Sequence, residues 1–199
     1  MIENLSVHGC VIVEAEPAAG KTTRIPPAVL DAYVTAKDIW VIEPRRIAAR
    51  MSARYVAQKR GEAVGGHVGY AVRNETQRSA ATRLLYLTDG LAFRWVLDDP
   101  LLSQVGVIIF DEFHERRIAS DALLALARAL RAGPRPDLKI IVMSATLSSQ
   151  ELSNYLEPAP IVRVAGRVFP VHVDHIERSD ARPIDDWVLS ALESSLLGG

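Results

Sequence analysis

Two short segments of this 199-residue sequence combine residue types that act together on phosphate groups. The first, residues 15–22 (AEPAAGKT), follows an apolar run and precedes a segment of helical character. A loop of this kind at a helix N-terminus points backbone N–H groups at an anion, while its lysine reaches the β- and γ-phosphates and its hydroxyl holds Mg²⁺. We therefore predict that Thr22 is a magnesium ligand and that a nucleotide is bound by Ala18, Ala19, Gly20, Lys21, Thr22 and Thr23.

The second segment places two carboxylates, Asp111 and Glu112, directly after the apolar run 107–110. In a parallel sheet this position lies beside the phosphate loop, where Asp111 can bind Mg²⁺ through a water molecule and Glu112 can deprotonate the water that attacks the γ-phosphoryl group. A solvated strand end would give the same pattern in isolation. Because Lys21 and its loop lie about 90 residues upstream, a hydrolytic site that uses ATP and Mg²⁺ is favoured.

A basic segment lies between residues 44 and 60, which include six Lys or Arg and no Asp or Glu. Its arginines are spaced to share one helix face beside an apolar stripe; the face consists of Arg46, Arg50 and Arg54, and the stripe of Ile47, Met51 and Tyr55. Such a face predicts salt-dependent, sequence-independent contact with a phosphate backbone. The alternative is a solvated face whose arginines pair with acidic neighbours.

The elements that must position these residues follow from the order of the apolar runs. Strands are expected at 11–13, 39–42, 83–87, 105–110, 139–143 and 161–164. Helices are expected after the phosphate loop to about residue 33, over 46–59, after each of the strands 83–87 and 105–110, and over 183–197. The glycine-rich stretch 61–74 is expected to be an excursion with a short strand at 70–72. Continuous Val and Ile runs are typical of a parallel sheet that is covered on both faces. The predicted fold is therefore α/β, a mostly parallel sheet with helices on both faces and ligands beyond the carboxyl ends of its strands.

Composition and charge narrow the class of protein. The hydrophobic fraction is 49%, the charged fraction is 24%, and 23 Lys and Arg against 24 Asp and Glu give a net charge of −1. Overall charge therefore predicts no avid nucleic-acid or membrane partner, and any nucleic-acid surface must be a local patch. The single cysteine, Cys10, excludes an intramolecular disulfide and fits a reducing compartment. Because no apolar run approaches roughly 18 residues and no signal peptide is present, we expect a cytoplasmic protein without a membrane partner.

Five motifs in a fixed order make the sequence resemble a known family. They are residues 15–22, Pro44-Arg45-Arg46, Thr88-Asp89-Gly90, Asp111-Glu112-Phe113-His114 and Ser144-Ala145-Thr146. The chain resembles the first RecA-like domain of the DEAH/DExH-box ATP-dependent helicases of superfamily 2. Residues 69–73 (GYAVR) and 111–116 (DEFHER) are similar to those of the bacterial HrpB-type members. The resemblance covers roughly residues 10–175 and implies a RecA-like P-loop NTPase fold.

The resemblance implies a role for each matching residue. The catalytic set would consist of Lys21, Asp111, Glu112 and His114. The nucleotide site would be coupled to strand binding through His114, Ser144 and Thr146. The path of the single strand would be lined by Arg45, Arg46, Thr88 and Asp89, to which the basic helix face adds Arg50.

The resemblance also implies partners and a domain organisation. Similar proteins use ATP and Mg²⁺ to translocate on single-stranded nucleic acid, with RNA favoured over DNA here. We expect residues 1–175 to form the first RecA-like domain, and residues 176–199 to be a linker and the first helix of a truncated second one. In this family the second domain supplies arginine fingers, and such a finger contributes about 10³–10⁵ in rate. The isolated chain is therefore expected to hydrolyse ATP slowly and not to unwind a duplex.

Two alternative functions remain open. Ala15 and Ala18 stand where the family often or usually has Gly, and a backbone position with positive φ tolerates a Cβ atom poorly. This departure leaves open a nucleotide-binding module with a degenerate loop. The other alternative is a P-loop ATPase that acts on a protein partner.

Three further features are given no chemical role. His172 and His175 lack additional clustered ligands and are expected at a strand end rather than at a metal. The stretch 123–127 (LLALA) is interpreted as the core face of a helix. The adjacent charges of Glu115 and Arg116 are interpreted as a local ion pair.

Overall fold

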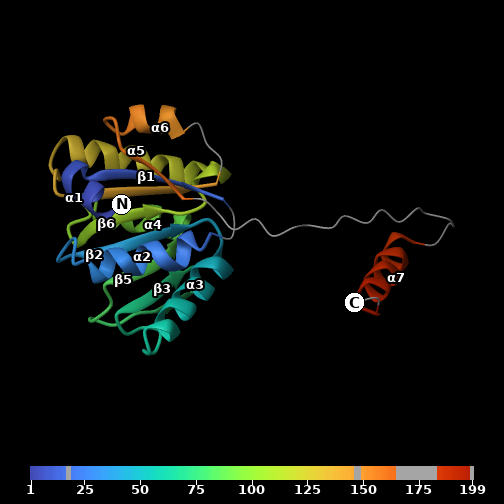
Figure 1. Cartoon of the computed structure of the whole chain (residues 1–199). Helices are drawn as coiled ribbons and strands as arrows, with labels where there is room; N and C mark the ends of the chain where they lie inside the picture. Colours follow the sequence, from blue (N-terminus) through green and yellow to red (C-terminus); the bar gives the residue numbers. More distant parts are fainter. Residues whose placement is uncertain (17–18, 146–148, 165–182, 198–199) are drawn as a thin grey trace. The chain divides into compact units, whose positions relative to one another are not determined.

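The computed structural model describes residues 1–16, 19–145, 149–164 and 183–197 (Figure 1). The chain divides into two compact units, Met1–Arg167 and Val168–Gly199. The helices of the first unit are α1 (Ile2–His8), α2 (Lys21–Asp31), α3 (Arg46–Lys59), α4 (Asp89–Asp98), the 3₁₀ turn η1 (Phe113–Glu115), α5 (Ile118–Ala132) and α6 (Ser149–Tyr155). Its strands are β1 (Cys10–Ala15), β2 (Asp38–Glu43), β3 (Val68–Val72), β4 (Glu75–Gln77), β5 (Leu84–Thr88), β6 (Val105–Phe110), β7 (Lys139–Ser144) and β8 (Ile161–Val164).

The strands form one sheet in the order β4-β3-β5-β2-β6-β7-β1-β8. Neighbouring strands are parallel except β3 and β4, which form an antiparallel pair. The mostly parallel α/β fold predicted from the apolar runs is confirmed, and all six of those runs are strands. The short strand expected at 70–72 is confirmed as part of β3. The expectation that this stretch is an excursion from the sheet is wrong, because β3 pairs with β5 inside the sheet. The elements α1, β4 and α6 were not predicted, and α2 ends at Asp31, slightly before the expected residue 33.

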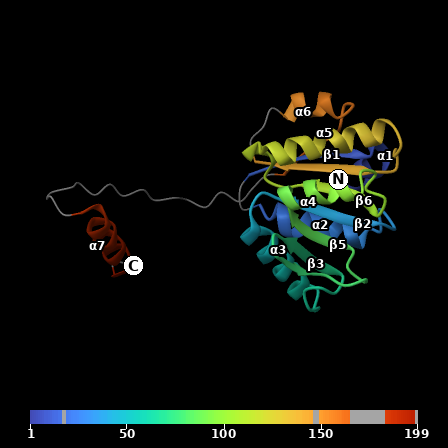
Figure 2. The same cartoon turned by 180° about the vertical axis from the view of Figure 1, so that it is seen from behind.

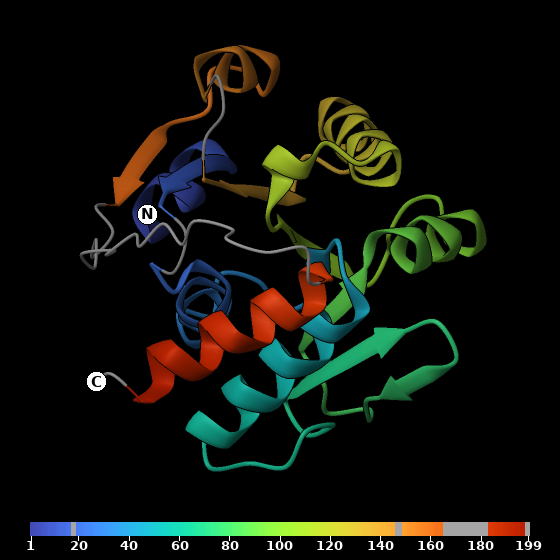
Figure 3. The same ribbon diagram turned by 90° about the vertical axis from the view of Figure 1, so that its right-hand side faces the viewer.

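Helices bury both faces of the sheet. Successive residues of a strand point to opposite sides, so each strand contributes side chains to both faces. On one face Val11 and Val13 pack with residues of α1, α2 and α3, and on the other face Cys10 and Ile12 pack with residues of α4, α5 and α6. Figures 1 and 2 view these two faces, and in Figure 3 the blue and teal helices α2 and α3 lie across the sheet from the green and yellow α4 and α5. The predicted core face of α5, within 123–127, is buried on the same face of the sheet as Cys10 and Ile12. Burial on both faces explains why the strand sequences are continuously apolar.

Helix α2 is tied to the sheet by a hydrogen bond that its own sequence makes necessary. Pro26 has no N–H, so the carbonyl oxygen of Thr22, four residues earlier, lacks its helical donor. The hydroxyl of Tyr86 on β5 donates to that oxygen at 2.9 Å. Burial, together with the nearby carboxyl groups of Glu43 and Asp111, raises the pKa of Tyr86 well above its ordinary value, so the hydroxyl keeps its proton. The first turn of α2 is thereby fixed against β5.

A buried arginine fixes the turn that leads into β6. The guanidinium of Arg135 donates to the carbonyl oxygens of Leu101, Leu102 and Val105 at 2.5–2.7 Å. It also forms an ion pair with Asp137 at 2.8 Å and thereby holds the pKa of that carboxyl well below its usual range. Because these carbonyl groups have a charged donor, the turn can be buried without unpaired polar atoms. The start of β6 is thus held in place, and its far end carries the predicted acidic pair.

In the second unit the structure describes one helix, α7 (Ile184–Leu197), close to the predicted 183–197. Asp185 and Asp186 lie in its first turn, where negative charge is favoured by the helix dipole. His172 and His175 lie outside the described residues. Within the part of the chain that the structure describes, none of the helices combines the length and the apolar character that a membrane crossing needs.

Candidate nucleotide and strand-binding site

The carboxyl ends of four neighbouring strands bring the predicted catalytic residues to one edge of the sheet. β1 leads into the phosphate loop, β2 ends at Glu43, β6 is followed by Asp111 and β7 ends at Ser144. These strands are adjacent in the order β2-β6-β7-β1. Parallel strands deliver their carboxyl ends to the same edge, so groups that are far apart in the sequence meet there.

The phosphate loop has the backbone that its glycine permits. Gly20, directly before α2, lies at φ 75° and ψ 23° in the left-handed region, which a residue without a Cβ atom adopts at little cost. Ala15 is the last residue of β1 and has no positive φ. The alanine at the first position of the motif therefore adds no backbone strain. Ala18 lies outside the described residues, whereas Ala19 donates its backbone N–H to the carbonyl oxygen of Glu16 at 3.3 Å.

The amine of Lys21 is held inside the loop by backbone oxygens. Nζ donates to the carbonyl oxygen of Ala15 at 2.6 Å and to that of Glu16 at 3.1 Å, and the side chain is buried. A carbonyl oxygen is a weaker partner for an ammonium group than a charged phosphate oxygen. An arriving phosphate can therefore take over the amine from the loop.

Thr22 and Asp111, the two predicted magnesium ligands, are in direct contact. The Thr22 hydroxyl donates a short hydrogen bond to Oδ2 of Asp111, and the backbone N–H of Glu112 donates to Oδ1 at 2.8 Å. Among the described residues, no group of three or more His, Cys, Asp or Glu side chains could hold a metal ion by itself. Mg²⁺ commonly takes one or two protein ligands and completes its shell with water and substrate phosphates. A hydroxyl and a carboxylate in contact therefore fit this ion as the companion of a nucleotide.

Glu112 and His114 lie side by side on the turn after β6. Nε2 of His114 is 3.3 Å from Oε2 of Glu112, and the backbone N–H of Ala145 donates to Nδ1 at 3.3 Å. Because Nδ1 accepts a hydrogen bond, the neutral ring carries its proton on Nε2 and can donate it toward Glu112. His114 therefore connects the acidic pair to the end of β7.

The two remaining coupling residues are only partly described. The Oγ atom of Ser144 is buried and has no hydrogen-bond partner within the described part of the chain. Thr146 lies outside the described residues. The contact between β7 and the acidic pair therefore rests on the backbone of Ala145.

A buried carboxyl group that sequence reasoning missed lies beside Asp111. Glu43 is 1% exposed and lines the same cavity as Thr22, Asp111 and Glu112. Burial, together with the Asp111 and Glu112 carboxylates, raises the pKa of Glu43 to about 9. Burial also raises the pKa of Asp111 to about 6, against the lowering effect of the hydrogen bond from Thr22. At neutral pH Glu43 is therefore uncharged. The sequence signal for Glu43 is a carboxylate at the end of an apolar strand, the same pattern that marks Asp111 and Glu112 after β6.

The predicted arginines of the strand path lie along one groove. Arg45, Arg46 and Arg50 line a groove of about 680 Å³ at the N-terminal end of α3, together with residues of β3 and β4. Arg46 donates to the carbonyl oxygen of Arg73 at 3.0 Å, and Arg50 pairs with Glu75 at 3.4 Å. The basic face therefore holds one arginine with an acidic neighbour and one that faces a backbone oxygen.

Thr88 and Asp89, the other two predicted path residues, are buried where β5 passes into α4. Asp89 is the first residue of α4, and its Oδ1 atom accepts the backbone N–H of Gly90 at 2.7 Å. Its Oδ2 atom pairs with Nε of Arg117 at 2.6 Å. Both carboxylate oxygens thus have partners inside the protein, so Asp89 orders this turn rather than presenting a free charge.

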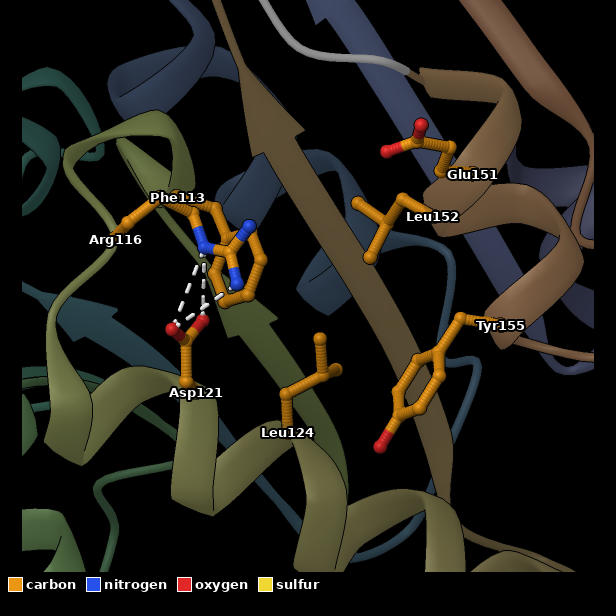
Figure 4. A pocket seen from close by; sticks show the side chains of 7 residues that line it. All are labelled: Phe113, Arg116, Asp121, Leu124, Glu151, Leu152 and Tyr155. Carbon is orange, nitrogen blue, oxygen red and sulfur yellow. Dashed lines mark hydrogen bonds and ion pairs between the residues drawn. The ribbon is translucent and has the colours of Figure 1, made fainter.

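The expected local ion pair between Glu115 and Arg116 is wrong. Glu115 pairs with Arg45 at 2.7 Å, and Arg116 pairs with Asp121 at 3.1 Å. Figure 4 shows the Arg116–Asp121 pair at the rim of a pocket of about 340 Å³, with the ring of Phe113 beside it. Adjacent residues of a tight turn project in different directions, so each of the two charges meets a partner on another element.

A further pocket adjoins the phosphate loop on the side of α3. It has a volume of about 490 Å³ and is lined by Ala19, Gly20, Thr23, Arg24, Tyr55 and Lys59. Tyr55 is 47% exposed, and Nζ of Lys59 lies 5.7 Å from the centre of its ring. Sequence reasoning treated Tyr55 as one member of an apolar stripe. The i, i+4 spacing of Tyr55 and Lys59 is the signal that places both on one helix face.

Comparison with known sequences agrees with this geometry. Residues 1–155 match the family described as DEAD/DEAH box helicase. The chain is 42% identical over 180 residues to the probable ATP-dependent RNA helicase DHR2 of Saccharomyces cerevisiae. The aligned region is 89% of this chain and 24% of that protein. It is 38% identical over 200 residues to the pre-mRNA-splicing factor ATP-dependent RNA helicase prp22 of Schizosaccharomyces pombe. The aligned region is 100% of this chain and 17% of that protein.

Solved structures give the same result. Two crystal structures of Escherichia coli HrpB, one described as a DEAH/RHA helicase and the other as a DExH-box NTPase, match the whole chain at 37% identity with TM-scores of 0.89 and 0.79. The chain covers 25% and 24% of those two structures, so it spans a quarter or less of each relative named here. Together with the RecA-like arrangement of the phosphate loop and the acidic pair, these matches show that the chain belongs to the DEAD/DEAH box helicase family, whose members use ATP.

Proposed function

We propose that this chain is the N-terminal ATP-binding domain of an ATP-dependent RNA helicase, which hydrolyses ATP to drive translocation on single strands when joined to a second RecA-like domain. The observation that carries this proposal is the contact between Thr22 and Asp111, which joins the phosphate loop to the acidic pair. Glu112 lies next to that contact and Lys21 lies within the loop. A site that only binds nucleotide does not need a carboxylate at the position of the attacking water, so this set favours hydrolysis.

In the proposed reaction each protein group has one task. Lys21 exchanges its two backbone partners for β- and γ-phosphate oxygens. Thr22 and Asp111 hold Mg²⁺, which supplies charge neutralisation on the phosphates when bound. Glu112 accepts the proton of the attacking water, and His114 holds the Glu112 carboxylate in place through Nε2. Positioning and charge neutralisation then account for most of the rate.

The nucleoside end of ATP is assigned to the pocket beside the loop. Ala19 and Gly20 contribute to both the loop and this pocket, so a nucleotide whose phosphates lie in the loop can extend into it. The half-exposed ring of Tyr55 offers a flat apolar face to a nucleobase, and Arg24 and Lys59 offer donors to its polar edge or to the ribose.

The nucleic-acid strand is assigned to the groove at the start of α3. Arg45, Arg46 and Arg50 contact phosphates there, and the buried turn at Thr88 and Asp89 supports the next part of the path. Contacts of this type give sequence-independent binding that weakens with salt. The names of the yeast relatives, both ATP-dependent RNA helicases, support RNA over DNA.

The domain organisation and location form part of the same proposal. Residues 1–175 act as the first RecA-like domain, and residues 176–199 act as a linker and the first helix of a second one. The proposal is supported by the small share of each relative that the chain covers, a quarter or less. A cytoplasmic location is proposed from the single cysteine, which suits a reducing compartment.

The test of the proposed substrate is the binding of a fluorescent single-stranded oligoribonucleotide, measured by anisotropy over a series of salt concentrations. The affinity should fall steeply with salt, and Arg46→Glu should weaken binding and lower the magnitude of the salt slope by about one. The matched control is Arg94→Glu, which makes the same charge change at an exposed residue of α4, a helix on the opposite face of the sheet. Binding that ignores salt, or an equal loss in both variants, would favour an ATPase that acts on a protein partner instead.

A further inference from the structure

The turn that carries the acidic pair has a strained backbone. Glu112 lies at φ 46° and ψ 38°, and Arg116 lies at φ 48° and ψ 59°. Both residues occupy the left-handed region, which residues with a Cβ atom adopt at a cost and keep only where the surrounding structure holds them. The conformation of residues 112–117, which we call the acidic-pair turn, therefore depends on its contacts with other elements.

Three ion pairs hold the acidic-pair turn from three directions. Glu115 pairs with Arg45 at 2.7 Å, and Arg117 pairs with Asp89 at 2.6 Å. Arg116 pairs with Asp121 on α5 at 3.1 Å, as Figure 4 shows. The first two partners, Arg45 and Asp89, belong to the two segments assigned to the nucleic-acid strand. The third partner belongs to the helix that directly follows the turn.

The two pairs that reach the strand path differ in exposure. The side chain of Asp89 is 6% exposed, so its pair with Arg117 is a fixed anchor whose loss would leave a buried charge. The side chain of Arg45 is 70% exposed, and exposed ion pairs are weak and easily exchanged. A phosphate group offers Arg45 a bidentate, fully charged partner in place of Glu115.

The other end of the turn is the catalytic carboxylate itself. Glu112 is three residues before Glu115, and the N–H of Glu115 donates to the carbonyl oxygen of Glu112 at 2.9 Å. His114, between them, contacts both Glu112 and the backbone of Ala145. A change at Glu115 therefore acts on the backbone that orients Glu112.

We propose that Glu115 is a positioning residue that couples the two sites: a nucleic-acid phosphate takes Arg45 away from Glu115, and the released turn reorients Glu112 toward the nucleotide. This inference rests on the proposed function, because it requires that the chain bind both ligands. Coupling in the opposite direction follows from linkage, since nucleotide must change the affinity for nucleic acid by the same factor.

The test measures the coupling directly in the 199-residue chain. The affinity for Mg·ADP is determined by calorimetry with and without a saturating single-stranded oligouridylate. In the wild-type chain the two affinities should differ by about fivefold or more. Glu115→Gln should bring them to within about twofold, and should itself bind the oligouridylate more tightly than the wild type because Arg45 has lost its competitor.

The matched control is Asp121→Asn. It removes one negative charge from a partner of the same turn but leaves the pair between Arg45 and Glu115 intact. Asp121→Asn should therefore keep the wild-type coupling, and unchanged melting temperatures of both variants would exclude general loosening of the fold.

Three outcomes would overturn the inference. Glu115→Gln could retain the full coupling, Asp121→Asn could lose it equally, or the wild-type chain could bind both ligands without any coupling. Failure of the proposed function is a distinct result, because the folded wild-type chain would then bind neither Mg·ADP nor the oligouridylate.

Discussion

At the residue scale, the nucleotide site is a set of charged groups whose partners already lie inside the protein. Lys21 is held by two backbone oxygens, and Asp111 accepts the hydroxyl of Thr22. Glu43, Asp111 and Glu112 crowd three carboxyl groups into one edge of the sheet. Burial of Glu43, together with repulsion from the Asp111 and Glu112 carboxylates, raises its pKa to about 9, so Glu43 keeps its proton at neutral pH.

This arrangement predicts how stability depends on pH in the absence of nucleotide and metal. The pKa of Glu43 is raised in the folded chain, from 4.5 to about 9, so its contribution to stability is complete at low pH and is lost as pH rises toward 9. The free energy of unfolding of the wild-type chain should fall by an amount on the order of 2 kcal/mol between pH 6.5 and pH 8.5. Glu43→Gln should flatten this dependence in urea titrations. A variant with the wild-type slope would show that Glu43 is ionised in the folded chain.

Local patterns were enough to predict some site residues and not others. Lys21, Asp111 and Glu112 sit in short motifs whose residue types suggest phosphate chemistry, and the structure brings Thr22 and Asp111 into contact. The local signals for Glu43 and Tyr55, a carboxylate at a strand end and an i, i+4 spacing with Lys59, do not by themselves mark a site, because burial beside other carboxylates and exposure beside the loop depend on which elements become neighbours. No local pattern reports such an arrangement.

At the element scale, helix α2 depends on β5 for its first turn. Pro26 and Pro27 lie inside this helix, so the chain cannot supply all of its backbone donors. Tyr86 supplies one of them from the sheet and fixes the turn that contains Thr22. The position of the predicted magnesium ligand is therefore set from a strand that carries no motif of the nucleotide site.

Tyr86→Phe should therefore affect both stability and nucleotide binding. The variant leaves the carbonyl oxygen of Thr22 without a donor, which should cost about 1–3 kcal/mol in the free energy of unfolding. It should also weaken Mg·ADP binding, measured by calorimetry, because the first turn of α2 is released. The matched control is Tyr70→Phe, a buried tyrosine opposite Tyr86 on β3 whose hydroxyl donates to Glu75 instead. If both variants bound Mg·ADP equally well, the role assigned to Tyr86 in the site would be wrong.

The sequence predicted the elements with strong periodicity and missed those that depend on pairing. The six apolar runs are strands, since a strand buried on both faces needs an apolar residue at nearly every position. β4 is a three-residue strand with polar side chains, and only its pairing with β3 makes it a strand. The predicted ion pair between Glu115 and Arg116 was wrong for a related reason. Opposite charges were assumed to pair locally, whereas each has a partner on another element.

At the scale of the whole molecule, the assigned nucleotide and strand sites share one edge of the sheet. The motifs follow β1, β2, β5, β6 and β7, all at their carboxyl ends. Short segments therefore connect the two sites. The acidic-pair turn pairs with Arg45 and Asp89 of the strand site, and Arg45 also lines the cavity that contains Thr22 and Asp111. The order of the motifs predicted this arrangement, whereas the proposed organisation of residues 176–199 remains a prediction.

The central claim, that the phosphate loop works with alanine at positions 15 and 18, is tested most directly by calorimetric titration of Mg·ADP into this chain. Lys21→Ala is the control, with folding checked by circular dichroism. We predict binding of the wild-type chain in the micromolar range and none by the variant, because the loop would lose its only side-chain ammonium group. A folded wild-type chain that does not bind, or a variant that binds equally well, would contradict the account.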